Sequence, residues 1–289
     1  MLVVLLIPLG IATLFYVIAL LRAAIAERAS PTPEALLLGA ATNFFDTLGI
    51  GSFAPTMAWF KFRRLVPDRL IPCTMFVGQT LPSVTQGIVF LLLLGVLVDA
   101  TLLVGCVLAC VVGGFVGVPL VTKARAWVVQ AVVGLGLILA AILYALTNLH
   151  LMPGGGTASA LPAPLLATAI VASFVFGVLL NFGIGNYAPT LALLSLMGMD
   201  PRLCFPIMAA SSGLTMASAS VRYIAIGELN LRIVTGMALG GLPAVFAAAF
   251  IVKSMPIEWL RWLVIVVVLY AAAVMLRAAF TGRSGTPQA

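Results

Sequence analysis

Long apolar runs dominate the chain, and short polar, glycine-rich or proline-rich segments separate them. Seven runs are each long enough to cross the roughly 30 Å hydrocarbon core of a bilayer: residues 2–21, 70–97, 100–122, 126–148, 204–226, 231–252 and 257–276. Two further apolar runs, 34–60 and 163–197, are interrupted by glycine and proline. The pattern predicts an all-α polytopic membrane protein with two broken helices.

The two interruptions have closely similar sequences. Residues 49–56 read GIGSFAPT and residues 183–190 read GIGNYAPT, an offset of 134 residues (183 − 49). The same offset places Pro67 on Pro201 without a gap. We therefore predict an internal duplication, and a broken helix at matching positions of two halves is typical of a transporter's binding site.

The duplication divides the chain into repeats. We predict five segments: an extra N-terminal transmembrane helix in residues 1–30, a first repeat in 31–149, a linker in 150–162, a second repeat in 163–280 and a polar, disordered tail in 281–289. Each repeat consists of one broken run followed by three spans.

The distribution of Lys and Arg indicates that each broken run enters the membrane and returns to the same face. Cytoplasmic loops carry the excess of basic residues. With re-entrant runs, an external N-terminus and an internal C-terminus, twelve of the fifteen basic residues are cytoplasmic, whereas full crossings would leave six there. The twelve are Arg22, Arg28, Lys61, Arg63, Arg64, Arg69, Lys123, Arg125, Arg222, Arg232, Arg277 and Arg283.

The number of crossings predicts the relation between the halves. A hairpin plus three spans is an odd number of crossings, so the second repeat is expected upside down relative to the first. We predict an inverted repeat whose two re-entrant hairpins enter from opposite faces and meet near the midplane.

The breaks are candidates for an anion site. Irregular backbone inside a membrane is tolerated where it lines a cavity, and the helix that resumes after each break presents its partially positive N-terminus there. Glycine lets backbone amides approach a ligand. The predicted substrate-binding residues beside the breaks are Asn43, Gly49, Gly51, Ser52, Phe53, Thr56, Asn181, Gly183, Gly185, Asn186, Tyr187 and Thr190.

Hydroxyl and amide side chains on the following spans extend this candidate site. They are Thr74, Gln79, Ser83 and Gln86 in the first half and Ser211, Ser212, Thr215 and Ser218 in the second. Their roughly helical spacing indicates a polar stripe that faces inward. A packing role is equally open for the second set, because small residues let membrane helices approach closely.

Asp46 is the acid closest to a break, one turn before the first one. Intramembrane acids are functional candidates, and Asp46 could take up a proton that drives or balances anion movement. The alternative is a carboxylate that accepts hydrogen bonds from the amides of the break itself. The repeat offset pairs Asp46 with Leu180, so the acid is not part of the duplicated core.

The remaining chemistry is sparse. The net charge of +7 comes from short basic clusters between apolar runs, so it indicates membrane orientation and no nucleic-acid partner. Cys73, Cys106, Cys110 and Cys204 lie in apolar runs and are expected to be buried, reduced thiols. No metal site and no cofactor is predicted, and no catalytic motif of a hydrolase, metalloprotease or nucleotide-binding enzyme is present.

At its duplicated motif the chain resembles the TauE/SafE family of sulfite and organosulfonate exporters. The matching positions are Gly49, Ile50, Gly51 and Pro55 with Val77, Gly78, Gln79 and Thr80, and Gly183, Ile184, Gly185 and Pro189 with Ser211, Ser212 and Gly213. The similarity spans roughly residues 34–278. The family commonly continues its motif with two more glycines, where this chain has Ser52-Phe53 and Asn186-Tyr187.

The resemblance implies a secondary transporter of small sulfur-containing anions, such as sulfite or sulfoacetate, in a bacterial cytoplasmic membrane. Its partners would be the anionic substrate, the lipid bilayer and a coupling proton or cation. Two alternatives stay open, a channel-like anion facilitator and a membrane accessory protein in which the breaks are purely structural.

Overall fold

The computed structural model of the chain describes residues 2–48, 51–67, 70–94, 97–121, 156–180 and 185–284, with scattered positions between 127 and 149. Throughout these parts the backbone is almost entirely helical. Seven of the described helices are long and apolar enough to cross a membrane. The prediction of an all-α polytopic membrane protein is therefore confirmed.

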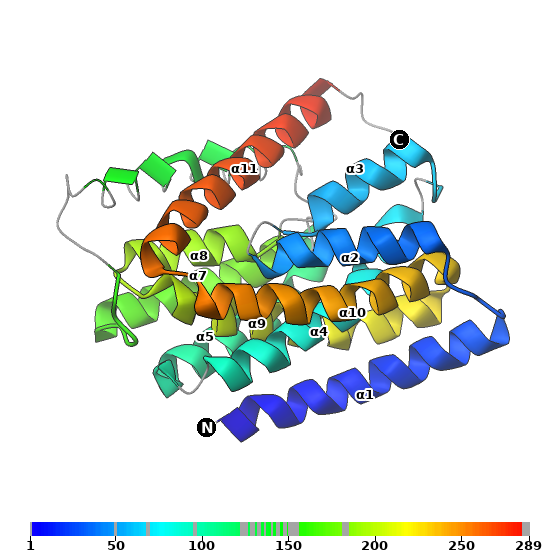
Figure 1. Cartoon of the computed structure of the whole chain (residues 1–289), viewed down its shortest axis with the longest axis horizontal. Helices are drawn as coiled ribbons and strands as arrows, with labels where there is room; N and C mark the ends of the chain where they lie inside the picture. Colours follow the sequence, from blue (N-terminus) through cyan, green and yellow to red (C-terminus); the bar gives the residue numbers. More distant parts are fainter. Residues whose placement is uncertain are drawn as a thin grey trace.

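The helices follow the predicted apolar runs closely (Figure 1). They are α1 (Leu2–Ala26), α2 (Pro33–Thr47), α3 (Phe53–Arg63), α4 (Ile71–Leu93), α5 (Ala100–Val121), α7 (Ala163–Leu180), α8 (Tyr187–Leu196), α9 (Pro201–Ile226), α10 (Leu231–Ser254) and α11 (Ile257–Ser284). The predicted span at 126–148 lies mostly outside the described residues. Because α11 continues to Ser284, the expectation of a disordered tail is wrong for residues 281–284.

The first broken run is a re-entrant hairpin of α2 and α3. At its base, Arg63 near the end of α3 pairs with Glu34 at the start of α2, with Nε and Oε1 2.9 Å apart. The indole of Trp59 donates to the same carboxylate at 3.1 Å. The hydrogen bond from Arg63 lowers the pKa of Glu34. This exposed ion pair adds little stability, but it shows that the two arms begin and end at the same face.

The second broken run, α7 and α8, is closed at its base by backbone hydrogen bonds. The amide of Ala158 donates to the carbonyl of Gly198 at 3.1 Å, and the amide of Asp200 donates to the carbonyl of Ala158 at 3.0 Å. The residues before α7 and after α8 therefore meet. With 18 residues, α7 is as long as a complete span although its hairpin returns to the face where it started.

The two hairpins are based at opposite ends of the bundle, which α4 connects. Near the start of α4, Thr74 accepts a hydrogen bond from the amide of Asn230. Close to Asn230 in the chain, Arg232 donates to the carbonyl of Ser30, which lies just before α2. After the other end of α4, the amide of Asp99 donates to the carbonyl of Ser159, just before α7. Entry from opposite ends is what an inverted repeat requires, and the symmetry itself stays a prediction.

Each hairpin packs on a helix of the other half. The arm α2 lies against α10, and α7 lies against α5. Both contacts depend on glycines where the backbones approach, since a Cβ at Gly240 would overlap the carbonyl of Leu36 and a Cβ at Gly113 would overlap the carbonyl of Phe174. Close approach at small residues is how membrane helices gain packing energy without a hydrophobic effect between them. The halves are thereby interlocked.

The predicted extra helix, α1, lies along one edge of the bundle (Figure 1). It packs mainly on α9 and also contacts α4. The buried hydroxyl of Tyr16 donates to the carbonyl of Val77 at 2.9 Å. The opposite face of α1 is apolar and exposed, as a lipid-facing surface is.

Candidate functional site

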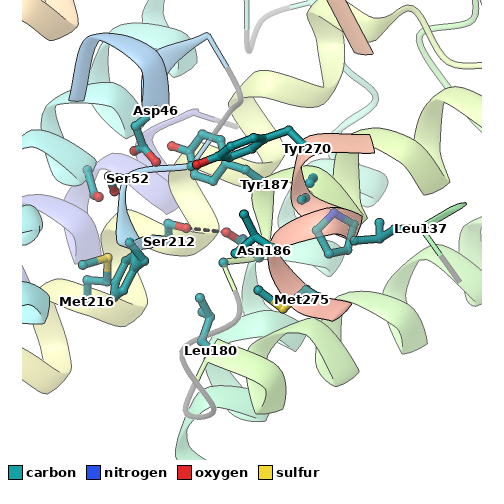
Figure 2. Close-up of a pocket in the computed structure, with 18 residues that line it drawn as sticks. Asp46, Ser52, Leu137, Leu180, Asn186, Tyr187, Ser212, Met216, Tyr270 and Met275 are labelled. Carbon is teal, nitrogen blue, oxygen red and sulfur yellow. Dashed lines mark hydrogen bonds between the residues drawn. The ribbon is translucent and has the colours of Figure 1, made fainter. Parts of the chain in front are cut away.

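A cavity of about 70 Å³ lies where the two hairpin tips meet (Figure 2). The arms that lead from it to the hairpin bases, α3 with 11 residues and α8 with 10, each rise about 15 Å. Its lining includes the predicted residues Asp46, Gly51, Ser52, Phe53, Ser83, Gly185, Asn186, Tyr187 and Ser212.

Residues related by the repeat offset line this cavity from both halves. Five such pairs are present: Asp46 with Leu180, Gly51 with Gly185, Ser52 with Asn186, Phe53 with Tyr187, and Leu137 with Ala271. Equivalent positions of the two halves therefore face each other across the site. The arrangement is consistent with the predicted pseudo-twofold relation.

The helices that start at the cavity lack the side-chain caps seen at the surfaces. Thr32, Asp200 and Asn230 cap the starts of α2, α9 and α10 with hydrogen bonds to first-turn amides. Ser52 and Asn186, which precede α3 and α8, make no such bond. Amides of a first turn have no carbonyl partner within their own helix. Both helices thus present amide hydrogens at the cavity.

Two prolines set how many amides each helix start presents. Pro55 and Pro189 occupy the third helical position of α3 and α8 and carry no N–H. The amides without a carbonyl partner in their own helix are therefore those of Phe53 and Ala54 in α3 and of Tyr187 and Ala188 in α8, together with those of the preceding Ser52 and Asn186. A proline is tolerated at the third position because an N–H there would have no intrahelical partner.

The acid at the first tip lies between Ser52 of its own break and Gln86 of α4. The side chain and the backbone amide of Ser52 lie beside its carboxyl group. From α4, Gln86 Nε2 donates to Asp46 Oδ2 at 2.9 Å and to Thr47 Oγ1 at 3.0 Å. Both interpretations of Asp46, a proton-binding acid and a carboxylate that accepts from the amides of its own break, are compatible with this geometry.

The second tip is organised by a neutral amide. Ser212 Oγ on α9 donates to Asn186 Oδ1 at 2.5 Å, and Asn186 Nδ2 donates to the carbonyl of Met208 at 3.3 Å. Asn186 is thereby fixed at the start of α8. The first tip carries an acid beside its helix start, whereas the second carries an amide and faces Leu180.

The remaining wall of the cavity is apolar, and sequence reasoning missed it. It is formed by Leu137, Leu180, Met216, Ala271, Val274 and Met275, and the ring of Tyr270 points into it beside the polar groups (Figure 2). Ala271, Val274, Met275 and Tyr270 come from α11, which has no charged residue between positions 262 and 276. The only available signal was the repeat offset, which relates Ala271 to Leu137.

Several predicted residues lie outside the cavity lining. Gln79 Nε2 donates to Thr56 Oγ1 at 2.9 Å and to Thr42 Oγ1 at 3.2 Å, so Gln79 and Thr56 join α4 to the first hairpin. Thr74 accepts from Asn230 at the surface end of α4. The others are placed within helix packing: Asn43, Thr190, Ser211, Thr215 and Ser218. Gly49, Asn181 and Gly183 fall outside the described residues.

In the described parts of the chain, no cluster of three or more His, Cys, Asp or Glu side chains could hold a metal ion. All four cysteines are free thiols, and Cys106, Cys110 and Cys204 are buried. His150 lies outside the described residues. The polar groups of the cavity are therefore hydroxyls, amides and one carboxyl group.

Comparison with known families finds a match in the second half of the chain. Residues 165–289, from the second hairpin to the C-terminus, match a family model. The family is Sulfite exporter TauE/SafE. This is the family that the repeated motif resembles, and its members are membrane transporters. No curated protein and no solved structure matches the chain.

The two glycines of the motif that line the cavity should respond differently to substitution. Gly51 has φ +90°, a conformation that side chains rarely adopt, whereas Gly185 is not in that region, and neither position has an atom near an added Cβ. We expect Gly51→Ala to lower the free energy of unfolding by about 1–2 kcal/mol, and Gly185→Ala to change it by less than about 0.5 kcal/mol. Thermal unfolding of the purified variants measures this difference; equal losses would contradict the described backbone.

Proposed function

We propose that the protein is a secondary transporter of small anions, sulfur-containing oxyanions or organosulfonates such as sulfite or sulfoacetate. Substrate would cross by alternating access around the two hairpins. The observation that carries this proposal is the cavity at which uncapped starts of α3 and α8, based at opposite ends of the bundle, converge. Amide hydrogens at helix N-termini bind oxyanions without a buried formal cation.

The size and polarity of the cavity fit this class of ligand. A single water needs about 10–15 Å³ measured in the same way, so about 70 Å³ suits a group of a few heavy atoms. Hydroxyls of Ser52, Ser83 and Ser212 surround the helix starts, and the apolar wall can contact a short carbon chain. Among the described residues that line the cavity there is no Lys or Arg.

The carboxyl group of Asp46 favours binding of a proton together with the anion. Two negative charges about 5 Å apart repel by about 3 kcal/mol at an effective dielectric constant of about 20. Protonation of Asp46 removes that repulsion. We infer that anion and proton occupy the site together and move in the same direction.

We further propose that the protein lies in a bacterial cytoplasmic membrane with its N-terminus outside and its C-terminus inside. Arg63 and Arg64 lie at the base of the first hairpin, at the same end of the bundle as Arg28 and Arg232. Arg202 lies at the opposite end of the bundle. The excess of basic residues marks the cytoplasmic face.

Labelling of single cysteines tests this orientation. Ser159 and Glu27 are exposed at opposite ends of the bundle. In a background without the native cysteines, a membrane-impermeant maleimide added to spheroplasts should label Ser159→Cys and leave Glu27→Cys unlabelled until the membrane is opened. The reverse pattern would show that the orientation is inverted.

Counterflow in proteoliposomes tests the transport proposal. Vesicles loaded with unlabelled sulfite or sulfoacetate should transiently accumulate the labelled anion, because a carrier exchanges substrate across the membrane. Equilibration without accumulation would indicate a channel-like facilitator. No flux with any sulfur oxyanion or sulfonate would argue against transport of this class.

Asp46→Asn tests the coupling within the same assay. The variant keeps an oxygen that can accept from Gln86 and Ser52 but cannot change its charge. We expect counterflow to persist while uptake driven by an imposed pH gradient falls to the level of empty vesicles. Unchanged gradient-driven uptake would eliminate the proton role of Asp46.

A further inference from the structure

One side chain is hydrogen-bonded to both hairpin tips. Gln86 on α4 is fully buried and does not line the cavity. Its Nε2 donates to Asp46 and Thr47 at the first tip, at 2.9 and 3.0 Å, and its Oε1 accepts the hydroxyl of Tyr187 at the second tip. Gln86 thus forms a bridge between an acid and a phenol that both face the cavity.

The charge of Asp46 decides which groups of this bridge donate hydrogen bonds and which accept them. An ionised carboxylate only accepts, so it holds the NH₂ of Gln86 and leaves the amide oxygen turned toward Tyr187. Tyr187 then uses its single proton on Gln86. In this state the phenol has no hydrogen to offer an anion in the cavity.

We propose that Gln86 is a positioning residue that makes the hydroxyl of Tyr187 available to the substrate anion when Asp46 binds a proton. The proposal rests on the proposed anion transport. A protonated Asp46 becomes a donor, and its new O–H is satisfied when the amide of Gln86 turns its oxygen toward it. The hydroxyl of Thr47, which donates to the carbonyl of Asn43 while it accepts from Gln86, rotates so that its hydrogen also reaches the amide oxygen of Gln86. The NH₂ then faces Tyr187 and donates to the phenol oxygen, so the phenol hydrogen is released toward the cavity. The proton comes from water at the face to which the cavity is open.

Few other titratable or charged side chains of the described residues lie near Asp46 and Tyr187. Of the described titratable side chains, Tyr187 from α8 and Tyr270 from α11 line the cavity with Asp46. The charged groups described on the helices packed against α2 lie near helix ends: Arg63 on α3 and Arg232 and Lys253 on α10. None of these cations is among the cavity-lining residues.

The bridge occupies positions at which the two halves differ. The repeat offset relates Asp46 to Leu180, Gln86 to Ser220 and Tyr187 to Phe53. Ser220 instead shares a hydrogen bond of 2.7 Å with Thr80, which joins α9 to α4. The shared core builds the cavity, and the three departures from it form one connected group.

The test measures what the phenol hydroxyl contributes to anion binding at two pH values. Methanesulfonate is a suitable probe because its charge does not change between about pH 5 and about pH 8.5, and calorimetry on purified protein gives its Kd. A hydrogen bond to a charged group justifies an expected loss of about tenfold or more for Tyr187→Phe at the lower pH. At the higher pH, where the phenol is held by Gln86, the expected loss is less than about twofold.

Two further variants separate positioning from stability. Tyr16→Phe removes another buried phenol hydroxyl, on α1 and outside the cavity, and should leave Kd unchanged at both pH values. In a Gln86→Met background, Tyr187→Phe should cost the same factor at both pH values because the bridge is gone. Thermal unfolding of each variant checks that it is folded.

The outcomes distinguish the two proposals. Saturable binding with an equal cost of Tyr187→Phe at both pH values in the otherwise unaltered protein overturns the role of Gln86 and leaves the transport proposal standing. No binding of methanesulfonate to the unaltered protein contradicts the sulfonate class, and the role of Gln86 falls with it.

Discussion

A helix that stops inside a bilayer leaves backbone amides that lipid cannot satisfy. This chain contains two such helix starts, at Phe53 and Tyr187, and the structure places both at one cavity. Each unsatisfied group in hydrocarbon would cost several kcal/mol, so the breaks require a polar environment at the centre of the fold. The interlocked packing of α2 on α10 and of α7 on α5 surrounds that environment with protein.

In the proposed mechanism, proton coupling arises where the two halves are unlike. The duplicated glycines, prolines and helix starts give a nearly symmetric frame for an anion. Asp46 and Tyr187 replace apolar counterparts in the other half, and Gln86 connects them across the frame. A symmetric site can hold an anion, but coupling to a proton needs a titratable group on one side.

The frame could be predicted from the sequence because it depends on repeated, local signals. The motif GIGxxAPT marked both breaks, and the charge distribution indicated hairpins. In the structure the pairs Glu34–Arg63 and Ala158–Asp200 close the two hairpins. The single acid at the first tip was also identified as one of the cavity's functional candidates. These features need only helix geometry and the cost of charge in lipid.

Tertiary details could not be predicted in the same way. Gln79, Ser83 and Gln86 lie on one side of α4, within about 60° of one another. Gln79 nevertheless binds Thr56 and Thr42 of the first hairpin whereas Ser83 reaches the cavity, because helix crossing decides which turn faces the tips. The wall residues Ala271, Val274 and Met275 of α11 have apolar side chains, so no polar pattern in the sequence indicates that they line the cavity. Likewise, Gly51 and Gly185 are equivalent in sequence, but of the two only Gly51 has a positive φ.

The central claim is that one anion is held between the starts of α3 and α8. A crystal structure with 2-bromoethanesulfonate tests it directly, because anomalous scattering from bromine fixes the orientation of the ligand. We predict sulfonate oxygens at the first-turn amides of Phe53 and Tyr187, with bromine against the apolar wall near Met275. A sulfonate bound elsewhere, or hairpin tips that lie apart with lipid between them, would contradict the account.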